Sequence, residues 1–167
     1  FPQDRERGIA TFEVPVRQAI EFFNSHIGPY TYEKLANVQA AGMGGGMEHA
    51  SAIFYGQTSI TDRPATGLVA HEIAHQWFGN AVTESDWDDA WLSEGFATYF
   101  THLTREHYSG RDSFISGLIR DKDRIAQMEE RLPGQAVVHV NLDDMGRVLS
   151  GIQYQKGGWV LHMLRGQ

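Results

Sequence analysis

The chain contains no cysteine. This absence excludes disulfides, thiolate-bound metals and a cysteine nucleophile. It leaves the compartment open, because a cysteine-free chain fits a cytoplasmic or an exported location equally well. Long apolar runs are also missing, since none approaches the 18 residues or more expected of a transmembrane helix. We therefore expect no membrane span in this segment.

Positive charge is scarce. Lys and Arg number 14 against 21 Asp and Glu, which gives a net charge of −7. Because no basic run is present, nucleic acid is excluded as an expected partner. The acidity could favour positively charged substrates, but a soluble surface is the simpler interpretation. The 41% hydrophobic and 11% aromatic residues are typical of a soluble globular protein.

Neither an internal repeat nor a low-complexity tract is found, and the order of the expected elements indicates the fold class. Strands are expected at 35–40 and 51–56, whereas the glycine-rich stretch 41–50 is expected to be irregular. Helices are expected at 14–27, from Pro64 to about Phe78, at about 89–108, at 112–130 and from about 150 to the end. Strands early and helices late predict an α+β layout with a sheet lobe and a helical lobe.

The length of 167 residues fits one domain. The chain has no initiator methionine and stops within a helical pattern. We therefore expect residues 1–167 to form a single domain that is a segment of a longer, multidomain protein.

Residues 71–75, HEIAH, place two histidines four positions apart. On a helix, His71 and His75 would lie one turn apart on the same face and could bind one ion. Glu72 would lie roughly 100° further round, where it could accept a proton from a metal-bound water. Two imidazoles favour zinc, one ion per chain. The three fixed positions of this motif, His71, Glu72 and His75, also occur together by chance in helices. On its own, the motif therefore fits two ordinary histidines as well as it fits a metal site.

A zinc hydrolase needs a third protein ligand and an open fourth position. A third histidine in the H-E-x-x-H-x-x-G-x-x-H arrangement is excluded, because Phe78 and Ala81 stand at its Gly and His positions. Glu94 follows His75 after eighteen residues, enough to end one helix and return with another. Its apolar neighbours indicate a core-facing helix, where a carboxylate is rarely left unpaired. The predicted ligands are therefore His71, His75 and Glu94.

Three segments together resemble the aminopeptidase N family of zinc metallopeptidases. They are HEIAHQWFGN (71–80), WLSEGFATYF (91–100) and GGMEHASAIFY (45–55). This family includes leukotriene hydrolase and belongs to the thermolysin-like gluzincins, and the resemblance extends from about residue 14 to the end. It implies a zincin catalytic domain with a small mixed sheet lobe, a helical lobe, and the zinc site between them. Flanking domains of the parent chain are expected as well.

The resemblance also implies roles for residues outside the metal motif. Glu48 would bind the free α-amino group of the substrate, and Gly45 and Gly46 would let the peptide backbone approach closely. Tyr154, in a Tyr-x-Lys-Gly sequence, would donate a hydrogen bond to the oxyanion.

Two positions depart from the family motifs. His49 stands where asparagine is usual, and we expect it to fill the same structural role rather than to bind the metal. Leu149 stands where a second tyrosine is usual, so that auxiliary role is missing or filled by another group.

These patterns predict a zinc-dependent aminopeptidase. A metal-activated water would attack the first peptide bond of a peptide with a free N-terminus, with Glu72 as the base and Tyr154 at the oxyanion. A thermolysin-like endopeptidase would share the metal ligands but has no reason to carry GGMEH. A catalytically inactive peptide-binding module is the other alternative, and the presence of every catalytic group argues against it.

Overall fold

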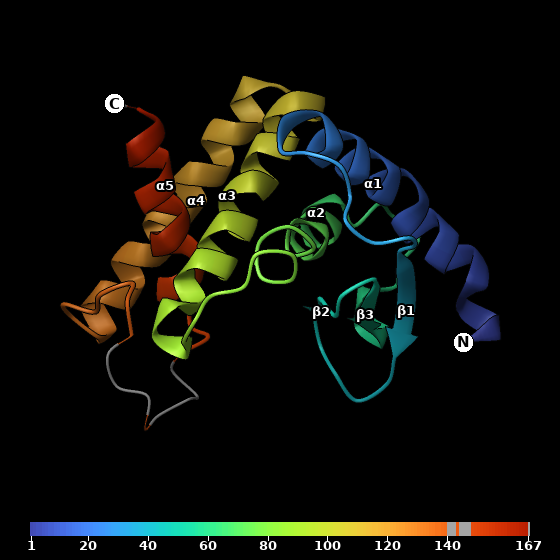
Figure 1. The fold of residues 1–167 in the computed structure, drawn as a ribbon, viewed down its shortest axis with the longest axis horizontal. Coiled ribbons are helices and arrows are strands. Elements are labelled where there is room, and N and C mark those ends of the chain that lie inside the picture. The colour runs from blue at the N-terminus through green and yellow to red at the C-terminus, as the bar shows by residue number, and fades with distance from the viewer. Residues whose placement is uncertain (140–142, 144–147, 167) are drawn as a thin grey trace. The chain divides into compact units, whose positions relative to one another are not determined.

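The computed structural model describes residues 1–139, 143 and 148–166. The chain forms two compact units, Phe1–Ala81 and Val82–Gln167, which are described one at a time. The first unit contains a short turn η1 (Pro2–Asp4), helix α1 (Arg5–His26), strands β1 (Ala36–Ala40), β2 (Gly46–Met47) and β3 (Ala52–Gly56), a turn η2 (Gln57–Ser59) and helix α2 (Thr66–Ala74) (Figure 1).

The sheet of the first unit is small and mixed, with β3 in the centre. β1 lies parallel to β3, and β2 pairs with its other edge in the antiparallel sense, with Gly46 opposite Tyr55. Both expected strands are confirmed. The expectation that 41–50 is wholly irregular is wrong, because backbone hydrogen bonds to the β3 edge need no side chain and Gly46–Met47 pairs there.

Helix α1 begins at Arg5, well before the expected start at Val14, and it carries Pro15 in its interior. A proline has no N–H, so the carbonyl four residues earlier loses its helical donor. Here the Thr11 carbonyl accepts a hydrogen bond from the Ala65 N–H instead, at 3.1 Å. This contact compensates the proline and ties α1 to the segment that leads into α2.

Helix α2 starts two residues after Pro64 and ends at Ala74, whereas the sequence indicated about Phe78. After Ala74 the turns tighten, because the N–H groups of Gln76 and Trp77 each bond a carbonyl three residues back at 3.0 Å. His75 keeps helical dihedrals as the C-cap, and its N–H still bonds the His71 carbonyl at 3.3 Å. The i, i+4 relation of the two histidines is therefore preserved.

The core of the first unit is assembled from α1, α2 and β3. Its fully buried apolar side chains are Ala19, Phe23, Ile53, Tyr55, Val69, Ile73 and Ala74. Trp77, just after α2, stacks on Phe23 with ring centroids 5.1 Å apart. This packing fixes the rotation of α2, and with it the direction of its polar residues.

The second unit is helical. It contains a short turn η3 (Trp87–Asp89), helices α3 (Ala90–Ser109) and α4 (Arg111–Arg131), a π-helical turn η5 (Ile152–Lys156) and helix α5 (Gly157–Arg165). Helices α4 and α5 both pack on α3 (Figure 1). The expected positions of α3 and α4 are confirmed to within about a residue, and the last helix begins as a π-helical turn.

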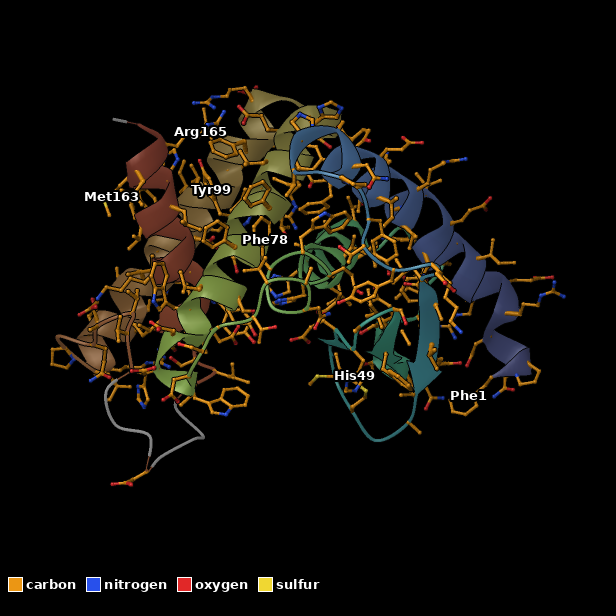
Figure 2. All side chains as sticks on the ribbon, in the orientation of Figure 1. Phe1, His49, Phe78, Tyr99, Met163 and Arg165 are labelled. Atoms are coloured by element: carbon orange, nitrogen blue, oxygen red, sulfur yellow. The ribbon has the colours of Figure 1, made fainter. Side chains whose placement is uncertain are left out.

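Aromatic packing holds the three helices of this unit together. Its buried cluster consists of Tyr99, Phe114 and Leu118. Tyr99 on α3 and Arg165 on α5 are labelled in Figure 2, and the Arg165 guanidinium lies 5.9 Å from the centre of the Phe114 ring. The small mixed sheet and the helical unit confirm the α+β class. Over the residues that the structure describes, no helix has the length and apolarity of a membrane span.

Candidate metal centre

The two histidines of the H-E-x-x-H motif converge on one point. The Nε2 atoms of His71 and His75 lie 3.2 Å apart, with the ring planes at 83°. Two nitrogen ligands at 2.0–2.1 Å from a tetrahedral zinc ion would be about 3.3 Å apart. The spacing also allows a hydrogen bond between the rings, but it is the spacing that a shared ion requires.

The tautomer of the neutral His75 ring follows from its backbone partner. Its Nδ1 lies 3.1 Å from the carbonyl oxygen of Phe78, which is labelled in Figure 2. A carbonyl can only accept, so Nδ1 of the neutral ring carries the proton and Nε2 keeps its lone pair. His75 is buried, with 1% of its surface exposed. This is the arrangement that orients a metal-binding imidazole.

The Glu72 side chain lies against the sheet of the same unit. It is 5% exposed and lies against the backbone of Gly46 in β2. A Cβ at position 46 would stand 2.3 Å from the Glu72 Cδ. Gly46 is therefore required to make room for this carboxylate. The sequence implied only closeness to the substrate for Gly46, and the contact with Glu72 is a separate reason for glycine.

Tyr55 on β3 is a buried neighbour of this carboxylate. Burial raises the pKa of the Tyr55 phenol, and the negative charge of Glu72 raises it further. The phenol is therefore neutral at physiological pH. It adds no second negative charge beside a carboxylate that is expected to accept a proton.

The loop after β2 carries Glu48, and two amide side chains hold its backbone. The Glu48 carbonyl accepts hydrogen bonds from Gln76 Nε2 at 3.1 Å and from Asn80 Nδ2 at 2.6 Å. Gln76 and Asn80 lie in the segment that follows α2. The loop and the histidine helix thus form one connected structure, with the Glu48 side chain half-buried.

The neighbours of Glu48 have distinct environments. Gly45 adopts φ +64°, a conformation that favours glycine. His49, labelled in Figure 2, is exposed and presents its ring edge to Phe54, with centroids 5.4 Å apart. This packing is consistent with the structural role expected for His49.

Glu94 and Tyr154 belong to the second unit. Glu94 lies on α3 and is buried, with 6% exposed. Tyr154 lies in η5 and is partly exposed at the edge of a recess of about 510 Å³. Helix α3 meets the start of α5, which follows η5 directly, at glycines, because a Cβ on Gly95 would stand 2.9 Å from the Gly157 carbonyl carbon. This close approach of the two backbones lies one residue after Glu94 and three residues after Tyr154. Leu149, also at the recess, is 50% exposed and supplies no hydroxyl.

A histidine pair in ligand spacing, on a helix that packs beneath a small mixed sheet, indicates the metallopeptidase class. Comparison with known proteins gives the family. Residues 12–167 match the model of the peptidase family M1 domain. The chain belongs to peptidase family M1, which confirms the resemblance to aminopeptidase N and leukotriene hydrolase.

Two curated relatives illustrate the similarity. Tricorn protease-interacting factor F2 of Thermoplasma acidophilum is 32% identical over 162 residues, which cover 89% of this chain and 21% of that protein. Glutamyl aminopeptidase of Rattus norvegicus is 29% identical over 181 residues, covering 99% of this chain and 19% of that protein. The chain thus spans about a fifth of the length of these relatives.

Solved structures show the same fold. The M1 zinc metallopeptidase from Deinococcus radiodurans matches with a TM-score of 0.75 and 28% identity, over 95% of this chain and 34% of that one. Yeast LTA4 hydrolase matches with a TM-score of 0.83 and 25% identity, over 92% of this chain and 26% of that one. The metallopeptidase fold expected from the sequence is confirmed.

Sequence reasoning missed Gln76, Asn80 and Tyr55. A signal existed for Gln76, because it is a polar residue inside the apolar run AHQWF and a buried amide needs hydrogen-bond partners. No local signal identifies the partner, since the Glu48 loop lies more than twenty residues earlier in the chain.

Proposed function

We propose that this chain is the catalytic segment of a zinc aminopeptidase, which removes N-terminal residues from peptides. The observation that carries the proposal is the pair of imidazole Nε2 atoms 3.2 Å apart, on the helix that also holds Glu72 and anchors the Glu48 loop. The family and the aminopeptidases among its relatives support it. Because those relatives are several times longer, domains that flank this segment in the parent protein are part of the proposal.

One zinc ion is proposed to be held by His71, His75 and Glu94. The histidine pair fits zinc because its nitrogen spacing matches and the tautomer of His75 places the lone pair of the ring on Nε2. Glu94 is proposed as the third ligand from its spacing after His75 and its burial, since a buried carboxylate calls for a cation or several donors. Three protein ligands leave the fourth position open for chemistry.

When bound, zinc would act as a Lewis acid towards the scissile carbonyl and lower the pKa of a bound water to about 7. Glu72 is proposed to take the proton of the attacking water and to deliver it to the leaving amine. Its confined position against Gly46 supports this role, because a base must be held within hydrogen-bond reach of the proton that it removes. The neutral Tyr55 phenol beside it keeps the surroundings free of a competing anion.

Tyr154 and Glu48 are proposed to act on the two sides of the reacting bond. The Tyr154 phenol would donate a hydrogen bond to the oxygen that becomes negative as the water attacks. The Glu48 carboxylate would pair with the substrate ammonium and so restrict cleavage to the first residue. Gly45 and Gly46 are proposed to let the substrate backbone approach the loop.

Blocked substrates separate an aminopeptidase from the alternative, a thermolysin-like endopeptidase. We expect the full-length enzyme to cleave free aminoacyl amides and to cleave their N-acetylated forms barely at all. Losing one member of a buried charge pair costs about 2–5 kcal/mol, because the other charge stays desolvated and unpaired. Glu48→Ala should therefore lower kcat/KM on free substrates by roughly 30-fold to several thousand-fold. On acetylated substrates the loss should be much smaller.

Glu33→Ala is the matched control, because Glu33 is an exposed glutamate of the same unit. It should leave both rates close to those of the native enzyme. Equal native rates on free and acetylated substrates would defeat the aminopeptidase proposal and favour the endopeptidase.

A further inference from the structure

Gln76 is a buried amide whose hydrogen-bonding groups all have partners. The residue is 1% exposed. Its Oε1 accepts from the Ser51 N–H at 2.9 Å and from the Tyr30 hydroxyl at 3.4 Å. Its Nε2 donates to the carbonyls of Glu48 at 3.1 Å and His49 at 3.5 Å. One side chain thus contacts both ends of the 48–51 loop.

Asn80 supports the same loop from a second point. Its Nδ2 donates to the Glu48 carbonyl at 2.6 Å, so that oxygen accepts from two amides at once. The Asn80 backbone is itself connected to the metal helix, because its N–H bonds the His75 carbonyl at 3.0 Å. Both supports therefore transmit the position of the histidines to the loop.

The loop needs such support because its backbone is strained. Ser51 has φ 63°, which is uncommon for a residue with a Cβ, and among the described residues it is the only non-glycine with a positive φ. The Gln76 Oε1 accepts from the N–H of this residue. Without that acceptor the partly buried Ser51 N–H would lose its partner, and the strained turn would lose the contact that stabilises it.

We propose that Gln76, assisted by Asn80, is the positioning residue that sets the selectivity of the site for a free ammonium group. It does so by holding the backbone of Glu48 at a fixed place relative to His71 and His75. The inference rests on the proposed function, in which Glu48 pairs with the substrate ammonium. Only two methylene groups separate the Glu48 carboxylate from its backbone, so a shift of the backbone displaces the carboxylate by a similar distance. A misplacement of about 1 Å can cost about 10²-fold in a positioned interaction.

The test measures ammonium selectivity without relying on turnover. An amino-acid hydroxamate and its des-amino analogue both chelate zinc, but only the first carries an ammonium. Calorimetric titration of the zinc-loaded, full-length protein gives the two dissociation constants, and their ratio is the selectivity. Gln76→Met, which keeps the volume and removes the amide, should lower this ratio by about 10- to 100-fold with unchanged zinc content.

Two further variants keep the experiment decisive. Asn80→Ala should lower the same ratio to a smaller extent, and it carries the test should Gln76→Met fail to fold. Tyr30→Phe is the matched control, because it removes the 3.4 Å contact with the Gln76 Oε1 and the 3.1 Å bond to the Lys34 carbonyl, and it leaves the Gln76 bonds to Glu48 and His49 intact. Its ratio should remain native.

Glu48→Ala distinguishes failure of this inference from failure of the proposed function. The positioning role is supported if Glu48→Ala abolishes the selectivity and the double variant, with Glu48→Ala and Gln76→Met together, shows no further loss. A merely structural Gln76 would weaken both ligands equally and leave the ratio unchanged. If Glu48→Ala abolishes the selectivity but Gln76→Met and Asn80→Ala leave it native, the inference is overturned. An unchanged ratio in Glu48→Ala itself would overturn the proposed role of Glu48.

Discussion

Gly46→Ala tests whether the sheet holds the catalytic base in place. A Cβ at this position would lie 2.3 Å from Cδ, 2.4 Å from Oε1 and 2.5 Å from Cγ of Glu72. Carbon atoms in favourable contact lie about 3.5–4.0 Å apart, so the two groups must separate by roughly 1 Å or more. Either the Glu72 carboxylate swings away or β2 shifts from its pairing with Tyr55.

The size of the effect follows from this displacement. A shift of about 1 Å in a positioned group can cost about 10²-fold in rate, so kcat should fall by about that factor. Overpacking a filled site typically costs about 1–3 kcal/mol of stability, so a measurable fall in the unfolding free energy is expected as well. Zinc content should remain native, because the three atoms nearest to the added methyl group all belong to Glu72, which is not a proposed ligand.

The assay compares kcat, metal content and denaturant unfolding of the full-length variant with those of Gly44→Ala. Gly44 lies in the same glycine run, but a Cβ there meets nothing within 4 Å, and its φ is not positive. Gly44→Ala should therefore keep a near-native kcat. A Gly46→Ala enzyme with native kcat would refute the claim that the contact with β2 positions Glu72.

Three further substitutions address the proposed roles separately. Glu72→Gln should keep zinc bound and lower kcat by at least about 10²–10⁴-fold, because the proton acceptor is gone; near-native turnover would refute the base. Glu94→Ala should abolish zinc binding by elemental analysis of protein purified without added metal, and full occupancy would exclude Glu94 as a ligand. Tyr154→Phe should lower kcat by about 10²–10³-fold with a smaller change in KM, whereas a change in KM alone would make Tyr154 a binding or packing residue.

Much of the fold was predictable because its signals are local. Helices α3 and α4 show continuous helical periodicity, and their bounds agree closely with expectation. The expected start of α1 was wrong for a tertiary reason. Pro15 can lie inside a helix because Ala65, fifty residues away, takes over the orphaned carbonyl. No window of sequence around Pro15 contains that partner.

The histidine pair could be predicted from the sequence alone, because an i, i+4 pair on a helix converges through helix geometry. The spacing of His71 and His75 in the structure follows from that rule. The contacts of the neighbouring residues depend on tertiary packing and could not be predicted in the same way. The contact of Gly46 with Glu72 and the hydrogen bonds of Gln76 to the Glu48 loop join segments more than twenty residues apart. Such contacts depend on how α2 packs against the sheet, and periodicity encodes which face of an element is buried but not which atoms that face will meet.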